Sequence, residues 1–507
     1  MTQRFNSRRL PASLGALVVG AAMVMASVPA ANAAPQDFGN IDADRSGSLT
    51  VHKYLHQSGS AQGDISQAPA DGTFSNPVKD VEFTVYPLLK DGEPLDLTLP
   101  SAWEGLATLT PGPACTAPSG FTLGTAIVMP KTDAAGTATI SLPLGFYQVC
   151  ETDAPASIVD IAPPFLLTVP MPHEKGWVYD VHAYPKNGET SVTKDIKAQE
   201  GFGLGAPVQF PVTNTIPRME ATTWTGYALR DTVDPRLTPN AATTGISSVT
   251  VDGVALDSSY YTKTIEGQTI TMNFTQAGLD WLNADPSKAG QKIEVVFDTI
   301  ITEVGNGTIT NDADLWVNNP TFDPEGENPP IPSNEVKTYW GNAELIKRAT
   351  GTTGNQGLLK GAEFEIYAAV DPYAATCDAA VAAGNAISIN GTTTFTSNEN
   401  GVISFPGLFV SDSENPVQNS EYRCYVIREI KAPAGYVLPD NADTAITVTV
   451  GQTTTTAHPE IVNTQQEVPE LPLTGAAGKV LLTLGGVSAA AIVVGLMLVN
   501  RRRTHSA

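Results

Sequence analysis

Hydrophobic and polar residues alternate in short runs along most of this 507-residue chain. The runs are rich in β-branched and aromatic residues, and glycine, proline, asparagine and aspartate separate them. This pattern is typical of the strands and turns of β-sandwiches, so we predict an all-β chain. The clearest strands are expected at 48–54, 81–86, 137–142, 292–297, 308–317, 361–367 and 445–450, and helical periodicity is limited to 276–283 and 373–384.

The two ends of the chain depart from this pattern and are continuously apolar. Near the N-terminus, arginines precede an apolar segment at 10–28, and Ala31-Asn32-Ala33 follows as an A-x-A cleavage site. This order predicts a secretory signal peptide at 1–33. Near the C-terminus, an apolar run at 480–499 has the length that spans a bilayer. The basic residues Arg501-Arg502-Arg503 then predict a cytoplasmic end.

An internal repeat indicates how the exported part is divided. Residues 78–86 resemble 359–367, and residues 147–155 resemble 425–433. Each copy follows a predicted strand that carries one lysine, Lys53 or Lys347. Two related sandwiches are therefore expected on either side of a different middle domain. The predicted domains are 34–187, 188–338 and 339–466, followed by a C-terminal sorting region at 467–507.

Charge and motif content narrow the function. The chain has 52 acidic and 29 basic residues and a net charge of −23, which argues against nucleic acid or anionic lipid as a partner. Its six histidines are scattered, and none of the motifs of hydrolases or nucleotide-binding enzymes is found. We therefore expect a protein that is not an enzyme and needs no cofactor.

Four cysteines outside the cell predict two disulfides, and four cysteines allow three pairings. We favour Cys115–Cys150 with Cys377–Cys424, because the other pairings would tie separate domains together. Asp42 begins a sequence similar to the start of an EF-hand loop, but the twelfth position is Lys53, where a bidentate glutamate is needed. We expect a turn there, and no metal site in the chain.

The sorting region carries Leu471-Pro472-Leu473-Thr474-Gly475 just before the apolar run. This pentapeptide resembles the LPxTG signal of Gram-positive surface proteins. The resemblance implies that a membrane transpeptidase, sortase, cuts between Thr474 and Gly475. It also implies that the enzyme's cysteine holds the Thr474 carbonyl as a thioester until an amine accepts it.

One lysine stands out as that amine. The stretch from Trp177 to Asn187 resembles the pilin motif of sortase-assembled fimbriae, WxxxVxVYPKN, and departs from it at Ala183. Alternation predicts a strand that Pro185 ends, which leaves Lys186 at its end. The resemblance implies that Lys186 joins Thr474 of another subunit. Such a heterologous contact does not close on itself, so it would generate a fibre.

A second motif points to chemistry inside the last domain. The stretch 425–436 resembles the pilin E-box, YxLxETxAPxGY, with Ile427 and Ile430 in place of leucine and threonine. In that family the glutamate promotes an isopeptide bond between a lysine and an asparagine. Burial favours this chemistry because it favours a neutral amine and a protonated carboxyl. The resemblance assigns Lys347, Glu429 and Asn463; the alternative is an ordinary Lys347–Glu429 salt bridge.

The middle domain lacks an E-box. Its first strand contains Lys194, Asn311 lies in a stretch similar to the last strand of related domains, and Asp231 matches the position of their catalytic acid. We expect a Lys194–Asn311 bond promoted by Asp231. Asn318 and Asn334 are alternatives to Asn311, and an uncrosslinked domain is a further alternative.

In the first domain, the corresponding residues are Lys53, Glu151 and Asn187. The E-box around Glu151 lacks its Gly-Tyr ending, so a Lys53–Asn187 bond is a weaker prediction than the other two.

The ordered set of motifs resembles the shaft subunit of a Gram-positive sortase-assembled fimbria, most like those of actinobacteria. The resemblance implies tandem immunoglobulin-like (CNA-type) β-sandwiches with internal isopeptide bonds. The implied partners are a pilin-specific sortase, identical subunits, a tip pilin and peptidoglycan, with a host glycoprotein or other bacteria as adhesion targets. The rival is a monomeric wall-anchored adhesin of collagen-binder type, which would need no acceptor lysine; base and tip pilins are closer rivals.

Overall fold

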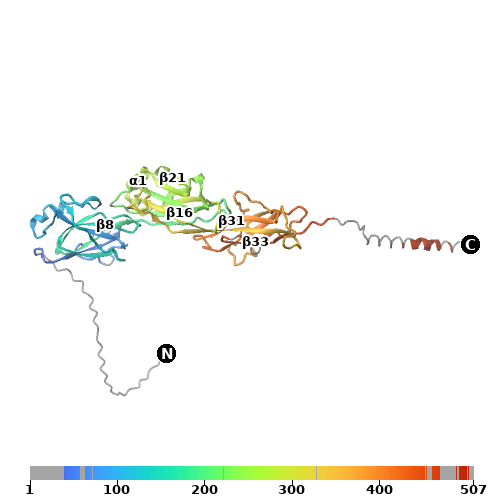
Figure 1. Ribbon diagram of the computed structural model, residues 1–507, viewed down its shortest axis with the longest axis horizontal. Helices are drawn as coiled ribbons and strands as arrows, with labels where there is room; N and C mark the ends of the chain where they lie inside the picture. The colour runs from blue at the N-terminus through green and yellow to red at the C-terminus, as the bar shows by residue number, and fades with distance from the viewer. Residues whose placement is uncertain are drawn as a thin grey trace, which may run out of the picture. The chain divides into compact units, whose positions relative to one another are not determined.

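The structure is a computed structural model that describes residues 39–56, 63–70, 72–220, 222–326, 328–451, 453, 460–468, 487, 490–498 and 501. The chain forms two compact units. The first contains residues up to Ala154 together with Ala162–Lys186, and the second contains Pro155–Ile161 and the chain from Asn187 onward (Figure 1). The predicted signal peptide and the pentapeptide 471–475 lie outside the described residues. The predicted division into three domains stays a prediction.

The first unit is built on two sheets that carry β-branched and aromatic side chains inward. Leu49, Val85 and Val149 are fully buried between them. The first sheet has the order β13-β1-β7 and the second the order β10-β8-β3-β4, with β5 and β6 also paired to β3. The strands are β1 (Gly47–His52), β3 (Glu82–Lys90), β4 (Glu93–Pro94), β5 (Thr122–Leu123), β6 (Ile127–Val128), β7 (Thr137–Leu142), β8 (Gly145–Asp153), β10 (Phe165–Val169) and β13 (Asp180–Ala183).

Shorter elements complete the first unit. A hairpin of β11 (Met171–His173) and β12 (Gly176–Val178) precedes β13. Other short elements are β2 (Tyr54–Leu55) and the 3-10 turns Pro100–Trp103, Leu106–Thr108 and Pro113–Cys115. β14 (Lys186–Glu189) begins at the boundary, and beyond it Gly188 pairs with Asp160 of β9 (Ile158–Asp160) in the second unit.

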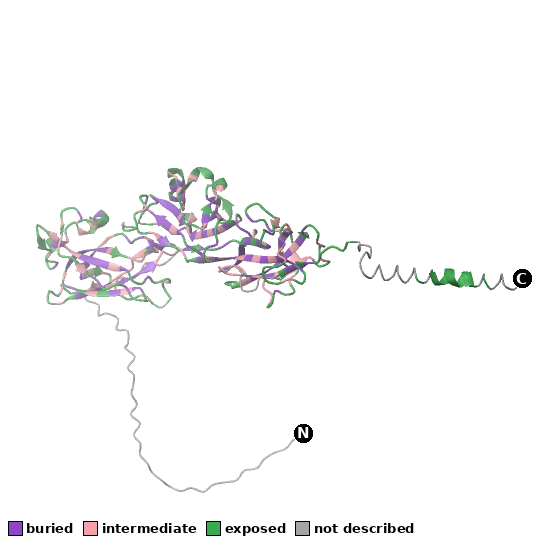
Figure 2. Ribbon diagram, turned by 45° about the vertical axis from the view of Figure 1, so that its right-hand side comes forward, coloured by how far each residue is buried: buried purple, intermediate pink, exposed green. Residues whose placement is uncertain are grey.

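The second unit begins with a sandwich of two antiparallel sheets. Along β16, buried residues alternate with partly exposed ones (Figure 2). One sheet has the order β15-β16-β23-β19-β20 with β18 beside β23, and the other has the order β21-β22-β17-β25-β26. The strands are β15 (Val192–Lys194), β16 (Pro207–Thr215), β17 (Tyr227–Thr232), β18 (Leu237–Pro239), β19 (Ile246–Val251), β20 (Val254–Ala255), β21 (Tyr261–Glu266), β22 (Thr269–Phe274), β23 (Lys292–Ile301), β25 (Asp314–Val317) and β26 (Ile331–Pro332).

The long strand β27 (Val336–Ala349, 14 residues) connects this sandwich to the rest of the second unit. Its first residues pair with β24 (Thr308–Asn311), and later residues pair with β31 (Val402–Asp412) and, in parallel, with β34 (Glu460–Asn463). The facing sheet has the order β29-β28-β32-β33, with β30 beside β28. Its strands are β28 (Glu363–Ala369), β29 (Ala382–Ala383), β30 (Phe395–Thr396), β32 (Tyr422–Lys431) and β33 (Asp443–Thr449).

The second unit therefore has one continuous core. Phe210, Leu315, Trp340 and Phe405 belong to a single cluster of buried hydrophobic residues. A loop after β15 also contacts β31, because Gly203 bridges to Leu408 and the Phe409 N–H donates to the Phe202 carbonyl. Both sequence-predicted sandwiches in this part of the chain are thus packed against one another.

The predicted all-β class is confirmed, and so is the helix expected at 276–283. Thr275 is the N-cap of helix α1 (Gln276–Asn283), and its hydroxyl accepts from the Gly278 N–H. The helix buries Leu279 and Leu282. The run expected at 308–317 is divided, because β24 pairs with β27 whereas β25 pairs with β17 in the other sheet. This division places Asn311 at the end of β24.

The helix expected at 373–384 was wrong. These residues form turns and the short strand β29. The Cys377–Cys424 disulfide and a hydrogen bond from the Val370 N–H to the Val381 carbonyl hold the stretch against neighbouring strands. Tertiary constraints thus override its alanine-rich composition. Cys115–Cys150 is also joined, so both predicted disulfides are present.

Residues 490–498 are helical. Among the described residues, no helix is long and apolar enough to cross a membrane. Much of the span predicted at 480–499 lies outside those residues.

Candidate functional site

The C-terminal centre brings together the three residues predicted for it. Lys347 lies on β27, Glu429 on β32 and Asn463 on β34, and each is at most 1% exposed. Lys347 Nζ donates to Glu429 Oε2 at 2.8 Å and also to Asn463 Oδ1. Asn463 Nδ2 donates to Glu429 Oε1 at 2.8 Å. The amine, the amide and the acid therefore form a closed triangle of contacts.

Strand register explains why these residues meet. β27 and β34 are parallel neighbours, with Ala349 opposite Asn463. Lys347 is two residues before Ala349, so the two side chains point to the same face of the sheet. Glu429 reaches them from the facing sheet, and the Phe364 ring lies 5.9 Å from Lys347 Nζ. Burial in this apolar setting lowers the pKa of Lys347, although the hydrogen bond to Glu429 opposes the shift.

The middle centre contains Lys194 on β15, Asp231 on β17 and Asn311 on β24. Lys194 Nζ donates to Asp231 Oδ2 at 2.6 Å and to the Asp312 carbonyl at 2.9 Å. Asn311 Nδ2 donates to the same oxygen, Asp231 Oδ2, at 3.2 Å. Within the described part of the chain, Asp231 Oδ1 and Asn311 Oδ1 are buried without a hydrogen-bond partner.

The protonation of this centre follows from its burial. Burial raises the pKa of Asp231 and lowers the pKa of Lys194, in each case against the attraction between the two groups. A protonated Asp231 would carry the proton on its own carboxyl group and would supply a donor for Asn311 Oδ1, which otherwise lacks one in the described part of the chain. It can then pair with the Asn311 amide and polarise its carbonyl, while the neutral amine acts as the nucleophile.

The two alternative asparagines make other contacts. The Asn334 side chain donates to the Lys194 carbonyl and accepts from the Lys194 N–H, both at 2.9 Å, so it supports β15 from the side. Asn318 Oδ1 accepts from the Thr225 N–H at 2.8 Å. Of the three candidates, Asn311 is the one whose amide contacts Asp231.

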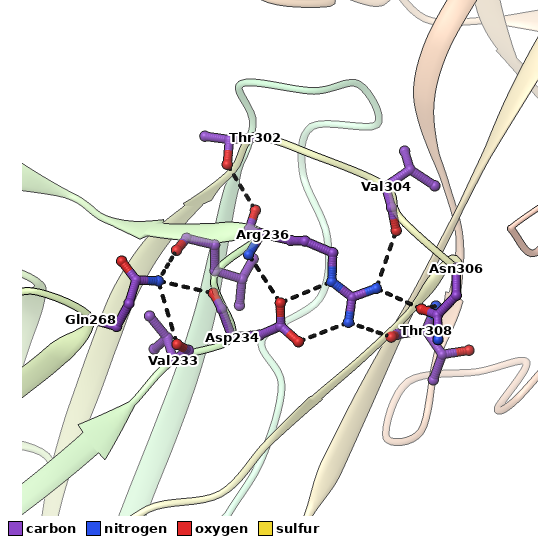
Figure 3. A network of polar contacts seen from close by, with 9 residues as sticks. Val233, Asp234, Arg236, Gln268, Thr302, Val304, Asn306 and Thr308 are labelled. Atoms are coloured by element: carbon purple, nitrogen blue, oxygen red, sulfur yellow. Dashed lines mark hydrogen bonds and ion pairs between the residues drawn. The ribbon is translucent and has the colours of Figure 1, made fainter.

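A polar network supports the start of β24 (Figure 3). The Arg236 guanidinium donates to both carboxylate oxygens of Asp234, at 2.8 and 2.7 Å. It also donates to Asn306 Oδ1 at 2.6 Å and to the Thr308 carbonyl at 2.8 Å. The network therefore fixes the first residue of the strand that carries Asn311. Sequence reasoning did not identify it.

The first unit contains a related buried ion pair. Lys53 Nζ donates to Glu151 Oε2 at 2.7 Å, and both side chains are at most 1% exposed. The same oxygen accepts from the Ala162 N–H at 3.0 Å. Asn187 is buried and belongs to the second unit. The Lys53–Asn187 pairing stays a prediction.

The predicted acceptor strand is present with one interruption. β12 and β13 cover it on either side of Tyr179, and β13 lies parallel to β1 with Val181 opposite Leu49. The hydroxyl of buried Tyr179 accepts from the Asp42 N–H at 2.7 Å.

Asp42 begins the turn that the sequence predicted, since its side chain accepts from the Asp44 N–H. The described residues contain no group of three metal-ligating side chains suited to an ion.

Lys186 follows Pro185 and is half-buried. It lies beside a groove of about 310 Å³ in the first unit, whose walls are mainly apolar. The groove is lined by Gly63, Ile65, Phe165, Leu166, Leu167, Met171, Val181, His182, Ala183, Tyr184 and Lys186. Lys186 Nζ lies 5.6 Å from the centroid of the Phe74 ring. The sequence analysis did not identify Phe74. The feature that could have indicated it is a single aromatic residue in a predicted loop of mostly small and polar residues.

Comparison with known proteins places this arrangement in a class. Residues 44–188 match the model of the Gram-positive pilin subunit D1, N-terminal domain. Residues 344–465 match a prealbumin-like fold domain, and residues 463–506 match the LPXTG cell wall anchor motif. The fold and the anchor thus define a pilin subunit of a surface fimbria anchored to the Gram-positive cell wall.

Whole-chain relatives make the assignment more specific. The chain is 40% identical to the fimbrial subunit type 2 of Actinomyces naeslundii, over 98% of this chain and 96% of that protein. It is 27% identical to the fimbrial subunit type 1 of Actinomyces viscosus, over 98% of each. The full-length major pilin SpaD from Corynebacterium diphtheriae superposes with a TM-score of 0.66 at 28% identity, covering 85% of this chain and 99% of SpaD. The chain belongs to the Gram-positive fimbrial subunit family, whose members are structural pilins.

Proposed function

We propose that a pilin-specific sortase joins Lys186 of one subunit to Thr474 of the next. The enzyme's cysteine thiol attacks the Thr474 carbonyl carbon and the Thr474–Gly475 peptide bond breaks. The Gly475 amine leaves with the thiol proton, and Thr474 is held as a thioester. The neutral Lys186 Nζ then attacks the Thr474 carbonyl carbon, an amide forms, and the departing thiolate takes up a proton. Because acceptor and donor are different parts of the same chain, the junction repeats without closing and builds a fibre.

The position of Lys186 is the observation that carries this proposal. The lysine is half-buried beside an apolar groove; it follows β13 after Tyr184 and Pro185, and it is the first residue of β14. An amine in such a place is held by its surroundings yet remains within reach of an enzyme-bound acyl group. A conventional wall-anchored adhesin would not need a lysine in this setting.

The buried centres support a second part of the proposal, that the subunit crosslinks itself. In the C-terminal centre Lys347 Nζ would bond to Asn463 Cγ, and Glu429 would carry the proton as ammonia leaves. In the middle centre Lys194 and Asn311 would react in the same way with Asp231. Lys53, Asn187 and Glu151 would form a third centre. Each bond is made once, so the chain modifies itself without turnover.

The remaining partners follow from membership of the family. We propose that the finished shaft ends in a tip pilin, is joined to peptidoglycan at its base, and supports adhesion to a host glycoprotein or to other bacteria. The shaft would consist of three domains per subunit, 34–187, 188–338 and 339–466. In each crosslinked domain, the bond would tie an early strand to a late one and confine the unfolded chain.

The test of the polymerisation proposal is a Lys186→Ala variant expressed from the full-length chain in the native host. We expect the high-mass ladder of covalent polymers to disappear while wall-linked monomer remains. Lys131→Ala is the matched control, because Lys131 is a half-exposed lysine of the first unit that pairs with Asp153; its ladder should be normal. A ladder that persists in Lys186→Ala would show that another amine is the acceptor.

A further inference from the structure

A strap, defined here as residues 63–70 and 72–76, lies over the acceptor strand of the first unit. The His182 N–H donates to the Ile65 carbonyl at 2.9 Å, so the strap is hydrogen-bonded to the backbone of β13. The Tyr184 hydroxyl donates to the Gln67 carbonyl at 2.5 Å. Gly63 lies flat on the same ring, where a Cβ would be only 2.0 Å from a ring carbon. The strap is therefore fixed to the residues that lead to Lys186.

A charged contact adds to this attachment. Asp64 accepts from Lys175 Nζ at 3.2 Å and from the Ser66 N–H at 2.9 Å. Asp64 also accepts from the Ser66 hydroxyl at 2.7 Å, and this bond, followed by that of the Ser66 N–H, lowers the pKa of Asp64 to about 2. Asp64 is therefore ionised at neutral pH and holds the strap against the hairpin before β13.

The strap carries Phe74 to the acceptor lysine. The Phe74 ring stacks on Tyr54 with 5.0 Å between centroids and lies 5.4 Å from the ring of Tyr184. Lys186 Nζ is 5.6 Å from the Phe74 centroid, within the range of cation–π contacts. Phe74 thus connects the acceptor amine to a cluster of three aromatic rings that come from separate parts of the chain.

We propose that Phe74 is a positioning residue for Lys186 in the sortase reaction; the inference rests on the proposed role of Lys186. A lysine side chain has many rotamers, and an unrestrained amine would seldom lie where the thioester arrives. The aromatic face restricts those rotamers and keeps the amine beside the groove, which favours the reactive geometry. The contact is weak enough to release the amine when it loses its proton and attacks.

Variants that keep or remove the aromatic ring at position 74 distinguish a role in positioning Lys186 from ordinary apolar packing. In the full-length chain, Phe74→Leu keeps an apolar side chain but removes the aromatic face. We expect the rate at which pulse-labelled monomer enters polymer to fall about two- to fivefold, the effect expected for one contact of this kind. Phe74→Trp should stay within about twofold of the natural chain, because it restores the face. Phe121→Leu is the matched control, since Phe121 is a half-buried ring of the same unit that packs on Phe146; it should polymerise normally.

Wall-linked monomer provides the folding control, because its formation does not use Lys186. If Phe74→Leu lowers both polymer and wall-linked monomer, a series of fluorinated phenylalanines at position 74 replaces it. Fluorination keeps the ring but weakens its negative face, and the polymerisation rate should fall stepwise with each added fluorine. Three results would overturn the inference. The polymerisation rate could be the same across the fluorinated series, Phe74→Leu could polymerise at the normal rate, or Phe74→Trp could be as slow as Phe74→Leu. A ladder in Lys186→Ala would instead reject the proposed function itself.

Discussion

The C-terminal and middle centres use the same three kinds of side chain but connect them differently. In the C-terminal centre, Glu429 offers one oxygen to Lys347 and the other to Asn463. In the middle centre, a single oxygen of Asp231 serves both partners, and its other oxygen has no partner in the described part of the chain. The shorter acid also lies farther from the amide, at 3.2 Å rather than 2.8 Å.

This difference has a chemical consequence. In the C-terminal centre, Lys347 already contacts the amide oxygen of Asn463, and the strand register alone brings them together. In the middle centre, Lys194 and Asn311 lie on strands that pair with different neighbours, and the acid links them. We therefore expect reaction of the middle centre to depend more strongly on the protonation of its acid.

Removing the acid of the C-terminal centre should have the largest effect. Glu429→Ala should abolish the Lys347–Asn463 bond and leave a buried lysine without its acid. The loss of the clamp corresponds to about 4–5 kcal/mol for a loop of this length, and the unpaired charge adds a further penalty. Limited trypsin digestion should show rapid cleavage at lysines and arginines within 339–466. Glu399→Ala, at an exposed glutamate, should match the natural chain; equal resistance of both variants would reject the role of Glu429.

Replacing the acid of the middle centre should have the next largest effect. Asp231→Asn keeps the size of the side chain but removes its acidic proton, so the Lys194–Asn311 bond should not form. The mass of the chain should rise by about 16 Da, because the retained ammonia adds about 17 Da and the substitution removes about 1 Da, with the C-terminal bond intact. Asp312→Asn is the control, because Lys194 contacts only the carbonyl of that exposed residue. An unchanged mass in Asp231→Asn would show that the acid is dispensable.

A pH titration extends the comparison to the first unit. His52, next to Lys53, has its pKa lowered from 6.5 to about 4 by burial and by repulsion from His182. The unfolded chain therefore binds a proton between these values while the folded unit does not, so its free energy of unfolding falls as pH drops from about 6.5 to about 4. The expected loss is about 2–3 kcal/mol. Denaturation followed by tryptophan fluorescence measures it. His52→Gln should make the profile less steep but not flat, because burial also lowers the pKa of His182. A natural chain with a flat profile would contradict the assignment.

The smallest expected effect concerns the support of β24. Arg236→Ala should lower the free energy of unfolding by about 1–2 kcal/mol, because it removes charged hydrogen bonds to Asp234 and Thr308. The effect is best measured in the Asp231→Asn background, where no covalent clamp masks it. Arg236 holds the pKa of Asp234 below its ordinary value, so this stabilisation is present above pH 4 and is lost as the pH falls through the lowered pKa. An Arg236→Lys variant indistinguishable from the natural chain would show that the forked geometry is unimportant.

The sequence predicted the elements whose signal is local. Alternation predicted the strands, helical periodicity at 276–283 predicted α1, and the repeat together with the E-box resemblance identified Lys347 and Glu429. The stretch 373–384 was misread because a disulfide, not helix propensity, decides its conformation. The shared oxygen of Asp231, the Arg236 network and the contact between Phe74 and Lys186 could not be predicted, because each depends on side chains that come from distant parts of the chain.

The most direct test of self-crosslinking is the intact mass of the reduced, secreted chain from Ala34 to Thr474. Each isopeptide bond removes one ammonia, about 17 Da. Crosslinking of the middle and C-terminal centres predicts a deficit of about 34 Da, and a Lys53–Asn187 bond would increase it to about 51 Da. A mass equal to that of the uncrosslinked sequence would contradict the account, since both buried centres would then be ordinary ion pairs.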